Sequence, residues 1–265
     1  MSLKPLADFP IADRKLVRVL LSDIDDTMTS EGMLPAKSLQ AMEAVRDAGI
    51  LFIPVTGRPA GWCDHIARMW PVDAVVGENG AFYFAYDRAA RKMRSVFAKG
   101  EEERRLDRDR LETLRAKILA AVPGVGIASD QDYRVADLAV DFCEDVAPLD
   151  EAEVARIVDM FAAAGATAKV SSIHVNGWFG NYDKLTMAER CLREVAGIDM
   201  TADNESIVFA GDSPNDAPMF GFFRHSVGVA NVRRFELPHQ PSWITQGESA
   251  DGFCQLANAL VEARR

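Results

Sequence analysis

Both ends of the chain alternate between short apolar runs and stretches with helical periodicity. Residues 16–24 and 50–56 are almost continuously apolar, as is typical of strands buried on both faces of a parallel sheet. Between them, Pro35 opens a stretch with apolar residues at helical spacing, and Gly49 closes it. A shorter amphipathic helix follows, and residues 73–80 form a third apolar run. This order of strands and helices predicts a doubly wound α/β core.

The pattern changes near residue 80, where the expected strands are joined by a polar turn. We expect a hairpin at 81–98, helices at 102–121 and 150–165, and strands at 136–142 and 168–178. The earlier pattern then returns, with helices at 184–196, after 214 and near 253–263, and strands at 206–212 and 225–230. We therefore predict an α/β fold with a doubly wound, Rossmann-like parallel-sheet core at 1–84 and 180–265, interrupted by an inserted α+β domain at 85–179.

Composition narrows the possible partners. The 265 residues are 48% hydrophobic and 26% charged, a balance typical of a protein with a sizeable core. The net charge of −10 argues against a nucleic-acid partner, and no apolar run is long enough to span a membrane. The start of the chain lacks the long apolar stretch of a signal peptide. The four cysteines are widely spaced and form no metal-binding pair, so we expect reduced thiols in a cytoplasmic protein.

Polar residues follow the predicted core strands at the points where those strands end. Because open α/β sheets bind ligands at the carboxyl ends of their strands, these residues are expected to gather at one edge. Several are aspartates, whose hard carboxylate oxygens suit Mg²⁺. The cation would also remove the repulsion between crowded carboxylates. The candidates at this edge are Asp23, Asp25, Thr56, Arg58, Lys184, Asp212, Asn215 and Asp216.

These residues lie in four short motifs, "SDIDDT", "VTGRP", "NYDK" and "GDSPND", in this order. The set resembles the haloacid dehalogenase-like hydrolase superfamily, and the inserted domain is similar to the α/β cap of the subgroup that holds sugar phosphatases and phosphomannomutases. The resemblance covers nearly the whole chain. It implies an α/β core with an inserted α+β cap, and a Mg²⁺-dependent phosphatase. Its substrate would be a small phosphorylated metabolite, such as a sugar phosphate, hydrolysed through an aspartyl-phosphate intermediate.

The resemblance also implies roles for the carboxylates. Asp23 would be the nucleophile that attacks phosphorus. Asp25 would protonate the leaving oxygen and later activate water, and in the family the backbone carbonyl at this position also binds metal. Asp212 would be a further metal ligand, and Asp216 would either bind the metal or support its ligands. Asp26 departs from the family pattern, which often has glycine there.

The remaining core candidates would contact the phosphoryl group. Lys184 would neutralise its developing charge. A lysine in the first turn of a helix opposes the helix dipole, which itself favours a nearby anion. Thr56 and the backbone amide of Gly57 would hold phosphate oxygens, and Asn215 resembles a position that contacts phosphate. For Arg58, contact with substrate and a solvated surface position both remain open.

Candidate specificity residues come from two predicted strands of the inserted domain. Alternation places Ile173 and Val175 on one face, and Ser172, His174, Asn176 and Trp178 on the other. In the strand at 136–142, Leu138, Val140 and Phe142 alternate with Asp137 and Asp141. We expect the apolar faces to pack on the two helices of this domain. The polar face, with Asp141, His174 and Asn176, would then contact the substrate, or it would be merely solvated.

Two other functions fit parts of the pattern. The stretch "SIHVNGWFGNYDK" also resembles phosphomannomutases, so a phosphomutase is the close enzymatic alternative. Receiver domains, which are phosphate-sensing regulators, also use clustered aspartates with Thr and Lys around Mg²⁺. Their motif order differs, however, and they are about half this length. The sequence does not determine the substrate, the pathway or the oligomeric state.

Overall fold

A six-stranded parallel sheet forms the centre of the computed structural model, which describes residues 3–171 and 173–265. The strand order is β1–β13–β12–β11–β2–β3. The strands are β1 (Lys4–Pro5), β2 (Val19–Ser22), β3 (Leu51–Pro54), β11 (Ile207–Gly211), β12 (His225–Gly228) and β13 (Trp243–Ile244). β2 lies between β3 and β11, which is where the strand order reverses and where such sheets bind ligands.

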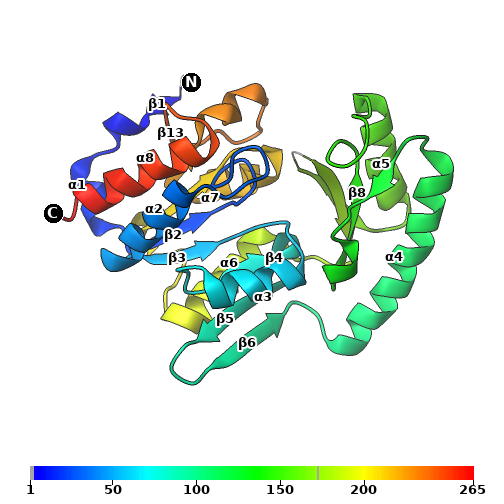
Figure 1. Cartoon of the computed structure of the whole chain (residues 1–265), viewed down its shortest axis with the longest axis horizontal. Helices are drawn as coiled ribbons and strands as arrows, with labels where there is room; N and C mark the ends of the chain where they lie inside the picture. The colour runs from blue at the N-terminus through cyan, green and yellow to red at the C-terminus, as the bar shows by residue number, and fades with distance from the viewer. Residues whose placement is uncertain (1–2, 172) are drawn as a thin grey trace.

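Helices cover both faces of this sheet (Figure 1). On one face lie α2 (Ala36–Asp47), α3 (Ala60–Met69) and α8 (Ser249–Glu262), and on the other lie α6 (Lys184–Ala196) and α7 (Ala217–Phe222). Within β2, Leu20 packs in the first layer, whereas Val19 and Leu21 pack in the second. Burial of alternate residues on opposite faces explains why this strand is apolar without interruption. The predicted doubly wound core is confirmed.

The first apolar run is shorter as a strand than its sequence pattern predicts. Leu16 is the last residue of α1 (Ile11–Leu16) and is 58% exposed, so the predicted strand at 16–24 was too long. Only Val19–Ser22 pairs with both neighbouring strands. Short 3-10 helices complete the connections, at Leu6–Asp8, Glu78–Gly80, Gln131–Tyr133, Asn204–Ser206, Pro214–Asp216 and Ala230–Arg234.

The predicted hairpin consists of β5 (Phe82–Asp87) and β6 (Lys92–Phe97). β5 also pairs with β4 (Val75–Gly77), and an isolated bridge joins Val55, just after β3, to Val76. The hairpin is therefore attached to the core side of the molecule, and the predicted boundary between residues 84 and 85 falls inside β5.

The inserted cap carries a four-stranded antiparallel sheet in the order β7–β8–β10–β9. Its strands are β7 (Gly126–Ile127), β8 (Asp137–Asp141), β9 (Thr167–Val170) and β10 (His174–Trp178), and its helices are α4 (Glu101–Ala121) and α5 (Glu151–Ala163). Leu138, Val140 and Val175 pack with α4 and α5, as the alternation predicts. Figure 1 shows this cap beside the core, with both chain termini on the core.

The predicted single strand at 168–178 was wrong, because a tight turn divides it into β9 and β10. The backbone N–H of Ser171 donates to the carbonyl of His174 at 2.8 Å, and the Ser171 hydroxyl accepts the N–H of His174 at 3.0 Å. These bonds reverse the chain. Ile173 consequently leaves the packed face that was expected for it and lines a cavity near His174. Ser172, a predicted member of the polar face, lies outside the described residues.

Candidate active site

Lys184 joins two of the predicted aspartates inside the protein. Its Nζ lies 2.7 Å from Oδ1 of Asp23 and 2.8 Å from Oδ1 of Asp216, and all three side chains are buried. Lys184 is the first residue of α6, and Asp183 caps this helix by accepting the N–H of Thr186 at 2.8 Å. Although burial opposes it, the two carboxylates raise the pKa of Lys184, so the ammonium group stays charged.

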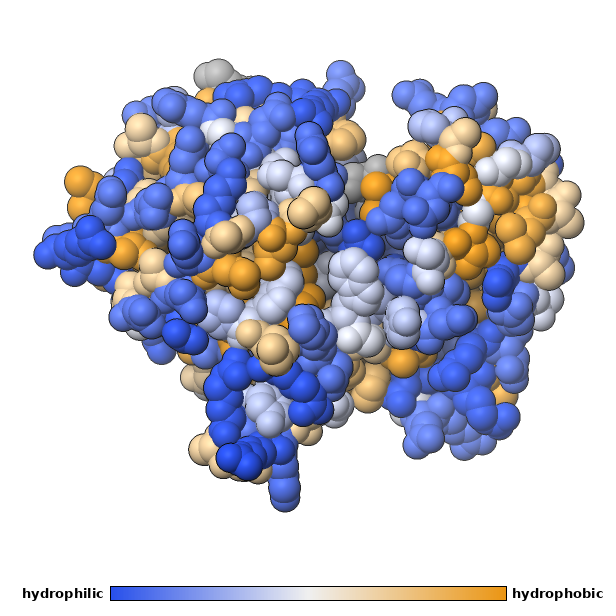
Figure 2. All heavy atoms as spheres, in the orientation of Figure 1, coloured by the Kyte–Doolittle hydropathy of each residue, from blue (hydrophilic) through white to orange (hydrophobic). Residues whose placement is uncertain are grey.

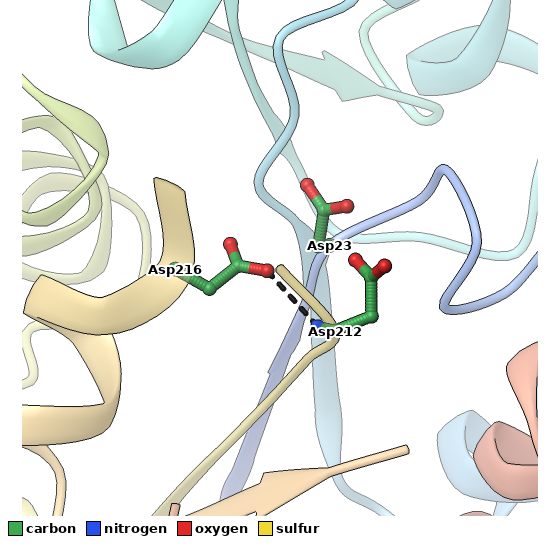
Figure 3. A group of neighbouring side chains, drawn as sticks. All are labelled: Asp23, Asp212 and Asp216. Carbon is green, nitrogen blue, oxygen red and sulfur yellow. Dashed lines mark hydrogen bonds between the residues drawn. The ribbon is translucent and has the colours of Figure 1, made fainter. Parts of the chain in front are cut away.

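Three carboxylates meet at the carboxyl ends of β2 and β11. Ligand atoms of Asp23, Asp212 and Asp216 all lie within 4.8 Å of one another (Figure 3). Oδ2 of Asp216 accepts the backbone N–H of Asp212 at 3.1 Å, and its Oδ1 is held by Lys184. In Figure 3 the carboxylates of Asp23 and Asp212 lie next to each other, whereas Asp216 points an oxygen at the Asp212 backbone. Asp216 therefore has both oxygens engaged.

The charge balance of this cluster fits a divalent cation. Three buried carboxylates face one ammonium group, so the cluster has excess negative charge when ionised. Burial raises the pKa of Asp23 to about 8, although Lys184 opposes the shift, and burial together with Asp216 raises the pKa of Asp212 well above its usual range. A cation bound between oxygens would remove this cost, and hard oxygen ligands are those that Mg²⁺ prefers. The group of Asp23, Asp212 and Asp216 is therefore one that could hold the metal.

Asp212 is oriented by two residues from other loops. Thr27, from the first motif, donates its hydroxyl to Oδ1 of Asp212 at 3.3 Å. Asn231 donates from Nδ2 to Oδ2 of Asp212 at 3.2 Å and to the carbonyl of Asp26 at 3.0 Å. Asn231 was missed by the sequence reasoning. The sequence pattern could have identified Asn231, because it lies shortly after β12, just as the other site residues lie shortly after their strands.

Asp25 and Arg58 form a bidentate ion pair. Nε of Arg58 lies 3.0 Å from each carboxylate oxygen of Asp25, and Nη2 lies 2.9 Å from Oδ1. The Arg58 side chain is only 7% exposed, which excludes the solvated surface position. Asp26 has φ of 53°, so the turn uses the left-handed region that favours glycine and that Asp tolerates.

The predicted phosphate contacts sit on the neighbouring loop ends. Thr56 is fully buried and accepts the N–H of Arg58 on its hydroxyl at 3.0 Å. Gly57 and Asn215 line a cavity together with Asp23 and Asp25. A Cβ at Gly57 would lie 3.2 Å from Nδ2 of Asn79. The close approach of the loop that carries Asn79 therefore favours glycine at position 57. The structure thus brings the core candidates of all four motifs together.

The cap supplies the other wall of this cavity, which has a volume of only about 20 Å³. His174 and Asn176 line it, as does Arg134, which the sequence reasoning did not select. Nδ2 of Asn176 donates to Asp137 at 3.0 Å. The volume is close to the space of one or two water molecules, so this cavity by itself is too small for a phosphorylated metabolite.

Asp141 differs from the other cap candidates. Its carboxylate is fully buried and accepts the backbone N–H groups of Cys143, Glu144 and Asp145 at 2.7–2.9 Å. It therefore shapes the turn after β8. Both oxygens are used in this way, so the structure gives Asp141 a role in this turn instead of the predicted contact with substrate.

Two further contacts between the cap and the core were invisible in the sequence. Glu144 of the cap lies 3.4 Å from Nη2 of Arg58 and 2.8 Å from Nε2 of His174. The close contact with His174, helped by Arg58, lowers the pKa of Glu144 to about 2. In addition, the fully buried Glu78 accepts the backbone N–H groups of Val135, Ala136 and Asp137 at 2.7–3.2 Å.

Comparison with known proteins agrees with this geometry. Residues 20–97 match the family model of the haloacid dehalogenase-like hydrolases. No curated protein matches the sequence. Similar solved structures include a Thermoplasma acidophilum protein, with 16% identity and a TM-score of 0.69 over 93% of this chain and 99% of that one.

Two others are named as phosphatases. The sucrose-phosphatase of Synechocystis, solved with sucrose and phosphate, is 15% identical with a TM-score of 0.58, covering 92% of this chain and 97% of its own. A subclass IIB sugar phosphatase is 15% identical with a TM-score of 0.60, covering 90% of this chain and 97% of its own. At these identities the structures show the fold alone. Residues 20–97, which hold the first two motifs, thus match the haloacid dehalogenase-like hydrolases, and the solved structures show that the chain shares the fold of these proteins.

Proposed function

We propose that this protein is a Mg²⁺-dependent phosphatase that hydrolyses a small phosphorylated metabolite through an aspartyl-phosphate on Asp23. The observation that carries the proposal is the position of Lys184 between Asp23 and Asp216, beside Asp212. Such a cluster can hold a metal and a phosphoryl group while placing one carboxylate oxygen for attack on phosphorus.

The reaction needs two proton transfers, which we assign to Asp25. An oxygen of Asp23 forms a bond to phosphorus while the bond from phosphorus to the substrate oxygen breaks. Asp25 gives its proton to the leaving oxygen, so the alcohol departs neutral. Asp25 then takes a proton from water, which attacks the phosphorus and releases phosphate and free Asp23. Arg58 orients the Asp25 carboxylate for proton transfer from water through its two contacts. Because this ion pair favours the ionised carboxylate, it must loosen for Asp25 to carry the proton that it gives to the leaving oxygen.

The other core residues would bind the phosphoryl oxygens. In this proposal, the phosphoryl group lies next to the attacking oxygen of Asp23. It is surrounded there by Lys184, Thr56, the backbone amide of Gly57 and Asn215. Mg²⁺ would be held by Asp23, Asp212 and the backbone carbonyl of Asp25, and when bound it neutralises charge on the phosphoryl oxygens. Asp216 would support this site through Lys184 and the Asp212 backbone.

Sugar phosphates are the first substrate class to test. Two similar folds belong to proteins that are named sucrose-phosphatase and sugar phosphatase. We also propose a division into a catalytic core and a cap. The predicted ranges were 1–84 with 180–265 and 85–179, and we move the first boundary past the hairpin of β5 and β6, which pairs with β4. A cytoplasmic location is a further proposal. No helix among residues 3–171 and 173–265 is long and apolar enough to cross a membrane.

A phosphomutase remains the second candidate, because the stretch around residues 172–184 resembles phosphomannomutases. The mutase reaction would need a phosphoenzyme that is shielded from water. The small cavity at Asp23 offers such shielding on the cap side only, since Asp212 also borders a large groove. A mutase would transfer phosphate back to a sugar and would require a bisphosphate activator. A phosphate-sensing regulator has less support, since it offers no reason for an acid–base residue at Asp25.

Phosphate release over a panel of phosphorylated sugars, polyols and nucleotides tests the proposal. We expect steady release of inorganic phosphate with Mg²⁺ and without a bisphosphate. A stable phosphoprotein with no turnover would support the regulator instead. Isomerised sugar phosphate formed only in the presence of a bisphosphate would support the mutase.

A further inference from the structure

Arg134 and Asn176, on the polar face of the cap, are paired within the protein, whereas Nε2 of His174 is buried near Glu144 without a hydrogen bond. Arg134 donates to Asp130 at 2.9 Å, to Asp137 at 3.0 Å and to the carbonyl of Gly57 at 2.9 Å. Asn176 donates to Asp137, and His174 lies against Glu144. These groups have few donors left for the hydroxyls of a substrate. The larger open space at the site is elsewhere.

A groove of about 770 Å³ lies between the cap and the core, next to the carboxylate cluster. Asp26 and Asp212 are among its lining residues, and Ser171 lines both this groove and the small cavity at Asp23. The groove therefore continues directly from the catalytic edge. In Figure 2, hydrophobic atoms gather on the cap beside the notch that separates it from the core.

The walls of this groove are mostly apolar. Val154 and Val158 lie one turn apart on α5, and both are only partly buried, whereas Ile157 and Phe161 of the same helix fill the cap core. Their inner sides pack on that core, and their outer sides face the groove. The further apolar side chains that line it are Phe142, Leu149 and Val170 from the cap and Pro214 and Phe235 from the core.

Charges in and around this groove exclude a second anionic group on the ligand. Glu151 and Asp159 line the groove together with Asp26, so a further phosphate or carboxylate would meet like charges. Arg234 also lines it, but its guanidinium is paired with Glu248 at 2.6 Å. The chemistry of the groove matches an uncharged apolar group attached to a single phosphate.

We propose that the substrate is a phosphate monoester whose alcohol carries an uncharged apolar group, and that this group lies in the groove against Val154 and Val158. The proposal rests on the phosphatase function and specifies its substrate class. The phosphate occupies the cluster of Asp23, Asp212 and Lys184, and the apolar group extends past Ser171 along α5. Burial of apolar surface in the groove would supply binding free energy. The polar face of the cap would supply less, because most of its polar groups are already paired within the protein.

A series of primary alkyl phosphates tests this inference, because ethyl, butyl and octyl phosphate have leaving groups of nearly equal acidity. All are used below their micelle concentrations with saturating Mg²⁺. We expect kcat/KM to rise at least tenfold from ethyl to octyl phosphate, since each buried methylene contributes a factor of about four at most. In the Val158→Asp variant, the ratio of kcat/KM for octyl phosphate to kcat/KM for ethyl phosphate should fall at least fivefold. Turnover of ethyl phosphate itself should stay within twofold of wild type. Val158→Thr, which has the same shape, should lose part of it.

Leu119→Asp is the matched control, because Leu119 is a 44% exposed apolar residue on cap helix α4, outside the groove. This variant should keep the full preference for octyl phosphate. Binding of ethyl- and octylphosphonate, measured by calorimetry, gives a readout that does not require turnover. Tighter binding of octylphosphonate without any phosphatase activity would uphold the groove and reject the proposed function.

Active hydrolysis of sugar phosphates with no effect of alkyl length, in turnover or in binding, would overturn the groove proposal and leave the phosphatase function standing. The occupant could also be a second copy of this chain. In that case wild-type protein would sediment as a dimer, Val158→Asp as a monomer, and chain length would have no effect. That outcome overturns the proposal as well.

Discussion

The guanidinium group of Arg58 contacts the Asp25 carboxylate through two nitrogens and also reaches Glu144 of the cap at 3.4 Å. One buried arginine thus joins the proposed acid–base residue to the domain that covers the site. Because Glu144 also lies against His174, a chain of side-chain contacts runs from the core motif into the cap sheet. Closure of the cap and orientation of Asp25 are expected to depend on each other.

Glu144→Gln tests this connection. Loss of the charge weakens the contacts with Arg58 and His174, so we expect kcat/KM to fall roughly three- to tenfold. Hydrogen exchange in β10 should become faster as the cap opens more often. Glu112→Gln on α4, where Glu112 pairs with Arg115 at the surface, is the control and should change neither quantity. Unchanged exchange in Glu144→Gln would reject its role in holding the cap.

Asp23→Asn should abolish turnover while the fold is retained, because the amide has the same shape and is a poor nucleophile. We expect less than a few per cent of wild-type phosphate release, with an unchanged circular dichroism spectrum. Asp26→Asn is the matched control, since asparagine also tolerates the left-handed backbone at this position. Substantial activity in Asp23→Asn would remove Asp23 as the nucleophile.

Chelation of Mg²⁺ should stop catalysis, and its return should restore activity. Excess Ca²⁺ should inhibit, because its larger and looser coordination shell fits in-line attack poorly. Phosphate release with and without EDTA measures this effect. Full activity in metal-free buffer would contradict the assignment of Asp23 and Asp212 as metal ligands.

Lys184→Ala should lower kcat by orders of magnitude, since the lysine charge is most useful in the transition state. It should also destabilise the metal-free protein by roughly 3–5 kcal/mol, because three buried carboxylates lose their cation. Lys184→Met, which fills the same space, separates the loss of charge from the loss of packing. Steady-state kinetics and urea unfolding measure the two effects. An effect on KM alone would instead assign Lys184 to uniform substrate binding.

The stability of the protein should depend on the ionisation of Glu78. Burial, with Asp137 nearby, raises the pKa of Glu78 to about 8 in the folded protein, so the folded state binds the proton more tightly than the unfolded state. This contribution to the free energy of unfolding is fully present below about pH 4.5 and is lost as the pH rises toward 8.

Glu78→Gln removes that titration. The free energy of unfolding of the wild type, measured relative to this variant, should therefore fall by roughly 2–4 kcal/mol as the pH rises from 5 to 9. Urea unfolding of both proteins with EDTA present measures it. A difference that stays constant with pH would show that Glu78 has the same protonation state throughout.

Much of the core was readable from the amino-acid sequence. Strands buried on both faces of a parallel sheet are continuously apolar, and the residues after them must gather at one edge, so the positions of Asp23, Thr56 and Asp212 follow from local pattern. The alternation in β8 and β10 likewise placed Leu138 and Val175 against the cap helices, because a strand turns successive side chains to opposite faces.

The tertiary structure decided which polar groups have partners. Asp141 and Asn176 lie on a polar face, but only the folded chain shows that turn amides and Asp137 already occupy them. Glu78 and Glu144 carry no local signal, because their contacts join residues far apart in the sequence. The division of the predicted strand at 168–178 into two strands likewise depends on hydrogen bonds of Ser171. The pattern of apolar and polar residues does not predict these bonds. Local pattern determines which face a side chain takes, whereas desolvation and distant partners determine what remains free to bind a ligand.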